Sequence, residues 1–285
     1  MIQGIGLGLI IILVGVGYAC WRWFSALGRP QSAQTQVQAE SELNGVPTIF
    51  LPGYFGNRFS FGFLLRRLVA AYAANKSMVI FVDRHGKLKV IGDLADTRSL
   101  VQVVFRDKTS RPKQQAEWLM TICELLATQY GVAAVNLVGH SMGCITIFWF
   151  LTHHQQAMPL AIKRVITIAG PFNDSEIAKS TGEIDAYPIN ATGPQEKTAI
   201  YRALARKVMM IPKGIKFLNI AGTISTDQQN DGQVSLNSAF SLRYLLRDPL
   251  IYYRELVIRG KRATHRLLHE NRVVDAHIAK FIWNA

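Results

Sequence analysis

The stretch Gly-His-Ser-Met-Gly at residues 139–143 constrains the fold of this 285-residue chain more than any other feature. Residues 132–138 before it form a short apolar and β-branched run, which is typical of a buried strand. Residues 144–151 after it are apolar on every face, as in a buried helix. A serine flanked at two residues' distance by glycines fits a very tight turn between such elements. The sequence therefore predicts a strand, a tight turn and a helix in direct succession.

The serine of this turn is a candidate nucleophile. A G-x-S-x-G sequence between a strand and a helix is typical of the nucleophile elbow, which holds the hydroxyl of the serine above the sheet. The backbone N–H of the next residue then points to where an oxyanion would form. We therefore expect Ser141 to be the catalytic nucleophile and Met142 to supply one oxyanion-hole donor. The alternative interpretation is an inert serine in a glycine-bracketed turn.

Elsewhere along the chain, short apolar runs alternate with segments of helical spacing. Strands are expected at 46–51, 78–82, 88–91, 100–105, 165–169, 216–222 and 252–258, and helices at 61–74 and 114–130. This alternation predicts an α/β fold with a mostly parallel central sheet and helices on both of its faces. Residues 173–212 form a long insertion, which we expect to be a small cap over the serine.

The N-terminal segment differs from the rest of the chain. Residues 2–19 carry no charged side chain, and this segment is just long enough for a membrane-spanning helix. Trp-Arg-Trp follows at 21–23, as at a membrane interface. A cleaved signal peptide is the alternative, but the segment lacks a basic start. We expect an uncleaved N-terminal membrane anchor at 1–24, a polar stalk at 25–45 and one catalytic domain at 46–285.

The chain is strongly basic, with 32 Lys and Arg against 19 Asp and Glu, a net charge of +13. No nucleic-acid-binding module accompanies this charge, so no nucleic acid partner is expected. A basic surface near anionic lipid head groups or acidic wall polymers is the favoured interpretation. Arg22 and Arg29 follow the apolar segment, and the positive-inside rule taken alone would place the domain on the cytoplasmic side.

An acid and a histidine are needed to activate the serine. Behind a nucleophile elbow they follow in the order serine, acid, histidine. Asp227 and Asp231 follow the expected strand at 216–222. We expect Asp231 to be the acid, because the Asp-Gly-Gln-Val that it begins resembles the acid loop of many bacterial lipases. For the base, resemblance to family patterns of the form H-x-x-L favours His265. His269 remains open, because it would lie about one helical turn further along the same side.

The second oxyanion donor is expected in the turn after the first core strand, where this chain reads Pro-Gly-Tyr-Phe-Gly at 52–56. The backbone N–H of Tyr54 would supply it. No metal or organic cofactor is expected, because acyl transfer by these residues requires none. The cysteines at 20, 123 and 144 have neither the spacing of a zinc site nor that of a disulfide framework.

Five stretches together resemble the α/β-hydrolase superfamily, and within it a family of cell-surface hydrolases of unknown function from Gram-positive bacteria. These stretches lie at 50–54, 138–143, 168–173, 230–235 and 268–271. The resemblance spans about residues 46 to 284 and leaves the expected anchor and stalk outside it. It implies an α/β-hydrolase fold and a lipase- or esterase-like serine hydrolase exposed at the cell surface. That implied location overrides the weak positive-inside count.

The expected reaction is cleavage of a carboxylic ester through an acyl-enzyme. An acyltransferase or amidase acting on cell-envelope polymers would use the same residues, and a non-catalytic surface-anchored binding module is a further alternative. The substrate is expected to be a small or lipid-like ester, with a medium acyl chain. Apolar residues that lie near the elbow and the cap in the sequence are Phe55, Phe148, Phe172, Met209 and Met210. Any of them could instead belong to the core, which is the favoured interpretation for Phe148.

Overall fold

A computed structural model describes residue 15 and residues 45–154, 157–175, 183–248 and 251–285. Nearly all of the expected membrane anchor and polar stalk therefore lies outside the described residues. In the described part of the chain, no helix has both the length and the apolar character needed to cross a bilayer.

The described domain is built on an eight-stranded sheet in the order β10-β9-β6-β5-β1-β4-β2-β3. Every neighbouring pair runs parallel except β2 and β3, which are antiparallel. The strands are β1 (Thr48–Leu51), β2 (Asn75–Val82), β3 (Leu88–Gly92), β4 (Ser99–Phe105), β5 (Ala134–His140), β6 (Ala161–Ile168), β9 (Lys216–Thr223) and β10 (Tyr252–Arg259). The strands predicted from the apolar runs are all present, and the fold is the expected α/β-hydrolase fold.

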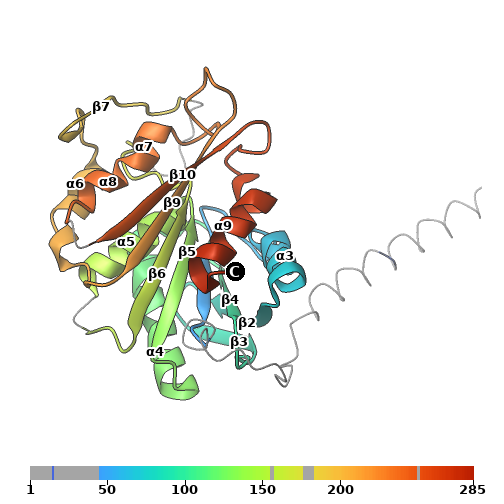
Figure 1. The fold of residues 1–285 in the computed structure, drawn as a ribbon. Coiled ribbons are helices and arrows are strands. Elements are labelled where there is room, and N and C mark those ends of the chain that lie inside the picture. Colours follow the sequence, from blue (N-terminus) through green and yellow to red (C-terminus); the bar gives the residue numbers. More distant parts are fainter. Residues whose placement is uncertain (1–14, 16–44, 155–156, 176–182, 249–250) are drawn as a thin grey trace, which may run out of the picture.

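Helices cover both faces of this sheet (Figure 1). On one face lie α4 (Pro112–Tyr130) and α5 (Met142–His153), and on the other lie α3 (Gly62–Tyr72) and α9 (Arg272–Trp283). Side chains of β1 alternate between these layers, because successive residues of a strand point to opposite faces. Ile49 and Leu51 pack with α4 and α5, whereas Phe50 packs with α3 and α9. A sheet buried on both faces explains the continuous apolar runs in the sequence.

The ends of the long helices follow from local chemistry. Pro112 occupies the first turn of α4, where a missing N–H costs nothing, and Gly131 ends the helix with φ +64°. At α9, the Asn271 side chain accepts a hydrogen bond from the backbone N–H of Val273. This cap fixes the start of α9 directly after the segment that carries the two candidate histidines.

The insertion between β6 and β9 contains a β7 (Ile189–Asn190) and β8 (Gly193–Pro194) hairpin, α6 (Ala199–Ala205) and the 3₁₀ helix η2 (Val208–Met210). Tyr201 and Leu204 of α6 are buried in the same cluster as α5. The helical part of the insertion thus packs on the side of the domain. The described residues of the insertion that line the cavity over Ser141 are Asp174, Glu183 and Ile184. Two short helices, α7 (Leu236–Phe240) and α8 (Leu242–Leu245), follow β9.

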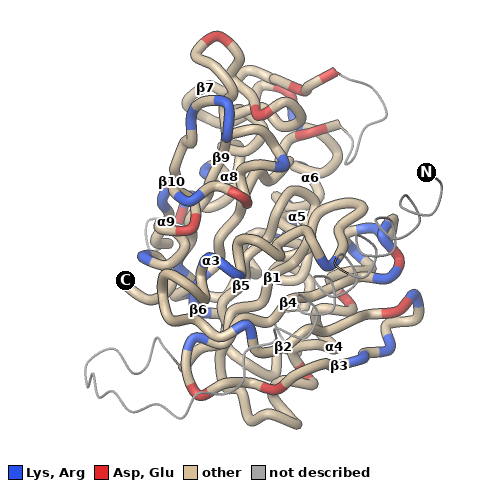
Figure 2. The backbone as a smooth tube through the Cα atoms, turned by 90° about the vertical axis from the view of Figure 1, so that its right-hand side faces the viewer, with Lys and Arg blue, Asp and Glu red and all other residues tan. Residues whose placement is uncertain are grey.

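Basic residues are spread over many elements of the domain. Lys and Arg positions occur near β10, β9 and α3 as well as at the β3 edge of the sheet (Figure 2). The positive charge of the described domain is therefore distributed, without one dominant basic element.

Candidate active site

The candidate residues meet at the carboxyl ends of the parallel strands, the edge at which open α/β sheets bind ligands. Loops after β1, β5, β9 and β10 surround a cavity of about 940 Å³. Ser141, His265 and His269 all line this cavity, as does the turn that contains Tyr54. Asp231 is buried behind it, only 2% exposed, whereas Asp227 is exposed in the loop after β9.

Ser141 has the strained backbone of a tight strand-to-helix turn. Its φ of +54° and ψ of −125° lie in a region that side-chain-bearing residues rarely adopt. The backbone N–H of Ser141 donates to the carbonyl oxygen of Ile168 at 2.9 Å, which ties the turn to β6. A Cβ on Gly143 would lie 2.4 Å from the carbonyl oxygen of Leu51. Only glycine allows this approach of α5 to β1, so the spacing of the motif has a steric cause.

Asp231 and His265 form a buried pair. The Nδ1–H of His265 donates to Oδ2 of Asp231 at 2.9 Å, and the backbone N–H of His265 donates to the Asp231 carbonyl at 2.8 Å. Oδ1 of Asp231 accepts from the backbone N–H groups of Gln233 and Val234. The carboxylate is thus held by main-chain donors and fixes the imidazole, which leaves Nε2 of His265 as the nitrogen available for proton transfer.

The turn after β1 places Tyr54 beside the elbow. The N–H of Gly56 donates to the carbonyl oxygen of Gly53 at 3.0 Å, and Phe55 adopts φ +55° with its N–H bound to the Lys108 carbonyl. Within the described residues, neither the N–H of Tyr54 nor that of Met142 donates to a protein acceptor. Two unoccupied amides next to a serine are what an oxyanion hole requires.

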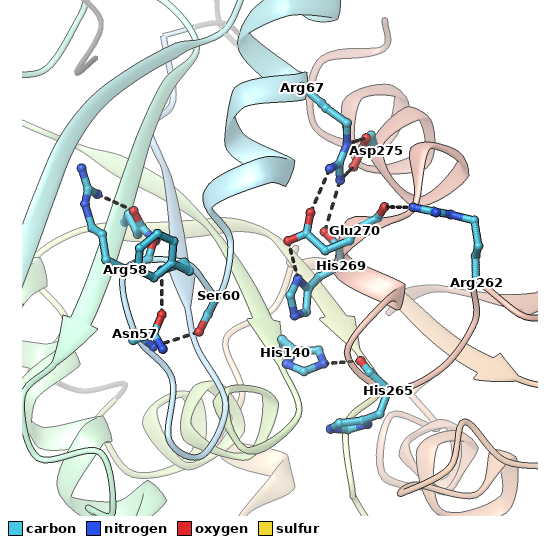
Figure 3. A network of polar contacts seen from close by, with 12 residues as sticks. Asn57, Arg58, Ser60, Arg67, His140, Arg262, His265, His269, Glu270 and Asp275 are labelled. Carbon is cyan, nitrogen blue, oxygen red and sulfur yellow. Dashed lines mark hydrogen bonds and ion pairs between the residues drawn. The ribbon is translucent and has the colours of Figure 1, made fainter. Parts of the chain in front are cut away.

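His269 lies in a different polar cluster from His265. Its Nδ1–H donates to Oε1 of Glu270 at 3.0 Å, and Oε2 of Glu270 accepts from Arg67 at 2.8 Å. Arg67 also binds the carboxylate of Asp275 on α9, at 2.5 and 3.0 Å (Figure 3). This cluster is not visible in the sequence. Glu270 adjoins His269 in the sequence, but nothing local indicates that Arg67 on α3 would reach it.

His140 is buried between the two candidate histidines. Its ring centre lies 4.8 Å from that of His265 and 4.5 Å from that of His269. Nε2–H of His140 donates to the carbonyl oxygen of His265 at 2.9 Å (Figure 3). Burial, and then the two neighbouring histidines, hold the pKa of His140 well below its ordinary value. A neutral His140 therefore supports the loop that presents His265.

The apolar residues predicted near the serine are only partly where they were expected. Phe55 lines the cavity and is 58% exposed. Phe148 is fully buried in the core, as favoured, and Phe172 is fully buried beside it, with the ring centres 5.1 Å apart. Met209 and Met210 do not line the cavity, because η2 lies beside α5. An apolar residue in the sequence does not reveal whether it faces a core or a cavity.

The described residues hold no group of three or more His, Cys, Asp or Glu side chains arranged for a metal ion. Cys123 and Cys144 are free and fully buried, and burial raises the pKa of both thiols. Buried thiols of this kind behave as small core residues. Cys20 lies outside the described residues.

Comparisons with known proteins agree with this architecture. A model of the family "Alpha/beta hydrolase of unknown function (DUF915)" matches residues 35–285. The chain belongs to this family of α/β hydrolases. No curated protein sequence matched this α/β hydrolase.

Solved structures with the same fold include the lin2722 gene product of Listeria innocua, with a TM-score of 0.74 and 23% identity over 84% of this chain and 94% of that one. A candidate cell surface hydrolase from Lactobacillus plantarum WCFS1 has a TM-score of 0.66 and 23% identity over 84% and 90% of the two chains. The lipase BlEst2 of Bacillus licheniformis, in its mature form, has a TM-score of 0.52 and 16% identity over 87% and 96%.

Proposed function

We propose that this α/β hydrolase is a serine hydrolase that cleaves a carboxylic ester through an acyl-enzyme. One observation carries the proposal. The buried Asp231–His265 pair, joined at 2.9 Å, borders the same cavity as a serine held at φ +54°. A carboxylate, an imidazole and a strained serine at one cavity are the parts needed for nucleophilic acyl transfer.

In the proposed reaction, the Ser141 hydroxyl oxygen attacks the ester carbonyl carbon while Nε2 of His265 accepts the hydroxyl proton. Asp231 stabilises the imidazolium that forms, and the amides of Tyr54 and Met142 donate to the oxyanion. As the tetrahedral intermediate collapses, the carbon–oxygen bond to the alcohol breaks and His265 gives that alcohol its proton. Water then attacks the acyl-enzyme by the same route and releases the acid.

His265 is proposed as the base rather than His269. His265 contacts Asp231, whereas the carboxylate partner of His269 is Glu270, which is itself bound to Arg67. A non-catalytic binding module would have no need to hold a serine in a strained turn beside a buried acid and histidine. An acyltransferase or an amidase would use the same groups with another acceptor or another scissile bond.

The substrate class and the location are proposed by analogy with the structural relatives. BlEst2 is named a lipase, and the Lactobacillus plantarum protein is named for the cell surface. We extend both to this chain as an ester substrate and an extracellular domain, with the apolar N-terminal segment as its membrane anchor. The uncharged residues 2–19 support that anchor.

The proposal is tested with the full chain and p-nitrophenyl esters of short, medium and long acyl groups. Hydrolysis by the wild type should be lost in Ser141→Ala, and His265→Ala should lower kcat far more than His269→Ala does. Equal turnover by the wild type and Ser141→Ala would overturn the mechanism. If His269→Ala alone abolished turnover, the base would be His269.

A further inference from the structure

The cavity that contains Ser141 holds a second carboxylate–imidazole pair, formed by His269 and Glu270, which the proposed reaction does not use. His269 is 9% exposed, and its Nδ1 lies 3.0 Å from Oε1 of Glu270. Arginine side chains bind the backbone carbonyls of both residues. Arg67 donates to the His269 carbonyl at 3.4 Å, and Arg262 donates to the Glu270 carbonyl at 3.0 Å. This pair is a rigid part of the cavity wall.

The charge on Glu270 fixes which nitrogen of His269 carries its hydrogen. Arg67 donates to Oε2 of Glu270 at 2.8 Å, and a carboxylate paired in this way with an arginine only accepts hydrogen bonds. In the neutral imidazole, Nδ1 of His269 therefore carries the hydrogen and Nε2 presents a lone pair. Nε2 forms no hydrogen bond within the described residues. This nitrogen keeps some exposed surface, and the ring of His269 lines the cavity. The wall thus presents a fixed acceptor, which suits a hydroxyl donor.

This acceptor lies on the serine side of the cavity. The ring of His269 packs edge-on against His140, which immediately precedes Ser141. The ring of His269 also lies 5.5 Å from the ring of Phe61. The residue before Phe61 is Ser60, and Ser60 lines the same cavity. Figure 3 shows Asn57 and Ser60, before α3, to the left of His269 and His140, with His269 and Glu270 in the segment before α9.

Asn57 and Ser60 extend the polar surface. The backbone N–H of Asn57 donates to the hydroxyl oxygen of Ser60 at 2.8 Å, and Oδ1 of Asn57 accepts from the N–H of Phe59 at 2.7 Å. The amide NH₂ of Asn57 and the hydroxyl proton of Ser60 are not used in any contact with the described chain. The wall therefore combines donors with the acceptor on His269, a mixture that suits hydroxyl groups, which both donate and accept.

We infer that Asn57, Ser60 and His269 form a subsite for the alcohol part of the ester, and that this alcohol carries a further hydroxyl close to the scissile oxygen. A glyceryl or other polyol ester has this chemistry, whereas a simple alkyl ester does not. The inference rests on the proposed ester hydrolysis and names the substrate class of that site. His269 acts as a binding and positioning residue, held by Glu270 and Arg67.

The test compares 1-butyrylglycerol with propyl butyrate, which share an acyl group and a carbon skeleton and differ only in the two hydroxyls. The full-length wild type should prefer the glyceryl ester by about 10-fold in kcat/KM, as one or two uncharged hydrogen bonds allow. In His269→Ala this preference should disappear, because kcat/KM for the glyceryl ester falls while kcat/KM for propyl butyrate changes less than about 3-fold. His269→Gln, which retains an acceptor, should keep most of the preference.

His85→Ala is the matched control, because His85 is exposed in the turn after β2 and does not line the cavity. It should leave both esters unchanged. An equal loss on both esters in His269→Ala, or no loss on either, would overturn the subsite. Binding of the uncleavable ether 1-O-butylglycerol separates the two claims. If the wild type cleaves no ester but binds this ether about 10-fold more tightly than His269→Ala, the proposed reaction fails and the subsite stands. Equal binding by both proteins would overturn the subsite.

Discussion

The strain at Ser141 leads to a stability difference between two inactive variants. Ser141→Ala keeps the Cβ that makes φ +54° and ψ −125° unfavourable, whereas Ser141→Gly removes it. Such a conformation costs about 1–3 kcal/mol. Glycine also increases the entropy of the unfolded chain, which costs about 0.4–1 kcal/mol. Ser141→Gly should therefore be the more stable variant by about 1 kcal/mol, or about 2–4 °C in Tm for a domain of this size.

Urea unfolding followed by circular dichroism measures this difference, with Thr128 as the matched control. Thr128 is exposed within α4, where glycine is less favourable than alanine by about 1 kcal/mol. The glycine–alanine difference should thus have opposite signs at the two positions. The contrary result would be the same glycine–alanine difference at both positions, with each glycine variant less stable than its alanine variant. The backbone at Ser141 would then not be strained, and the steric argument for the elbow would be wrong.

Three other variants probe the site. Asp231→Asn should lower kcat by about 10³–10⁴-fold with little change in KM, because the amide no longer fixes the His265 tautomer. Steady-state kinetics measures this, and a loss of less than about 10-fold in kcat would refute the role of Asp231. Gly143→Ala places a Cβ 2.4 Å from the Leu51 carbonyl oxygen and should cost about 1–3 kcal/mol in urea unfolding, whereas unchanged stability would show that α5 can shift freely. For His140, the folded-state pKa is depressed by burial and by its two histidine neighbours, so only the unfolded state binds a proton just below about pH 6.5. The wild type should therefore lose up to about 1.4 kcal/mol per pH unit as pH falls below that value, and its stability relative to His140→Gln should decline between pH 7 and pH 5; a constant difference would contradict the assignment.

The strands and the helices α3, α4 and α5 could be predicted because each buries a face that the sequence displays. Residues 100–105 lack alternation, and β4 is indeed buried on both sides. The short helices α7 and α8, of five and four residues, are below the length at which a helical period is visible. The insertion was expected over the serine, but its apolar face packs against α5. A periodic pattern indicates that a helix buries one face and does not identify what covers it.

The candidate site was predictable where chain order limits the options. The loop after the strand at 216–223 offers Asp227 and Asp231, and the histidines after the last strand are few. The structure joins Asp231 to His265 and Glu270 to His269. The choice between the histidines depends on contacts that the sequence does not encode locally. The ion pair of Arg67 with Asp275 joins residues 208 positions apart, so no spacing rule could have found the polar cluster behind His269.

The central claim is that Ser141 is an activated nucleophile, and covalent labelling tests it most directly. An alkyl fluorophosphonate reacts with a serine hydroxyl whose proton a neighbouring base removes, and intact-mass measurement counts the adducts. We expect a single adduct on the full chain, located on the peptide that contains Ser141, with no adduct on Ser141→Ala and much slower labelling of His265→Ala. An unlabelled wild type, or the same adduct on Ser141→Ala, would contradict the account.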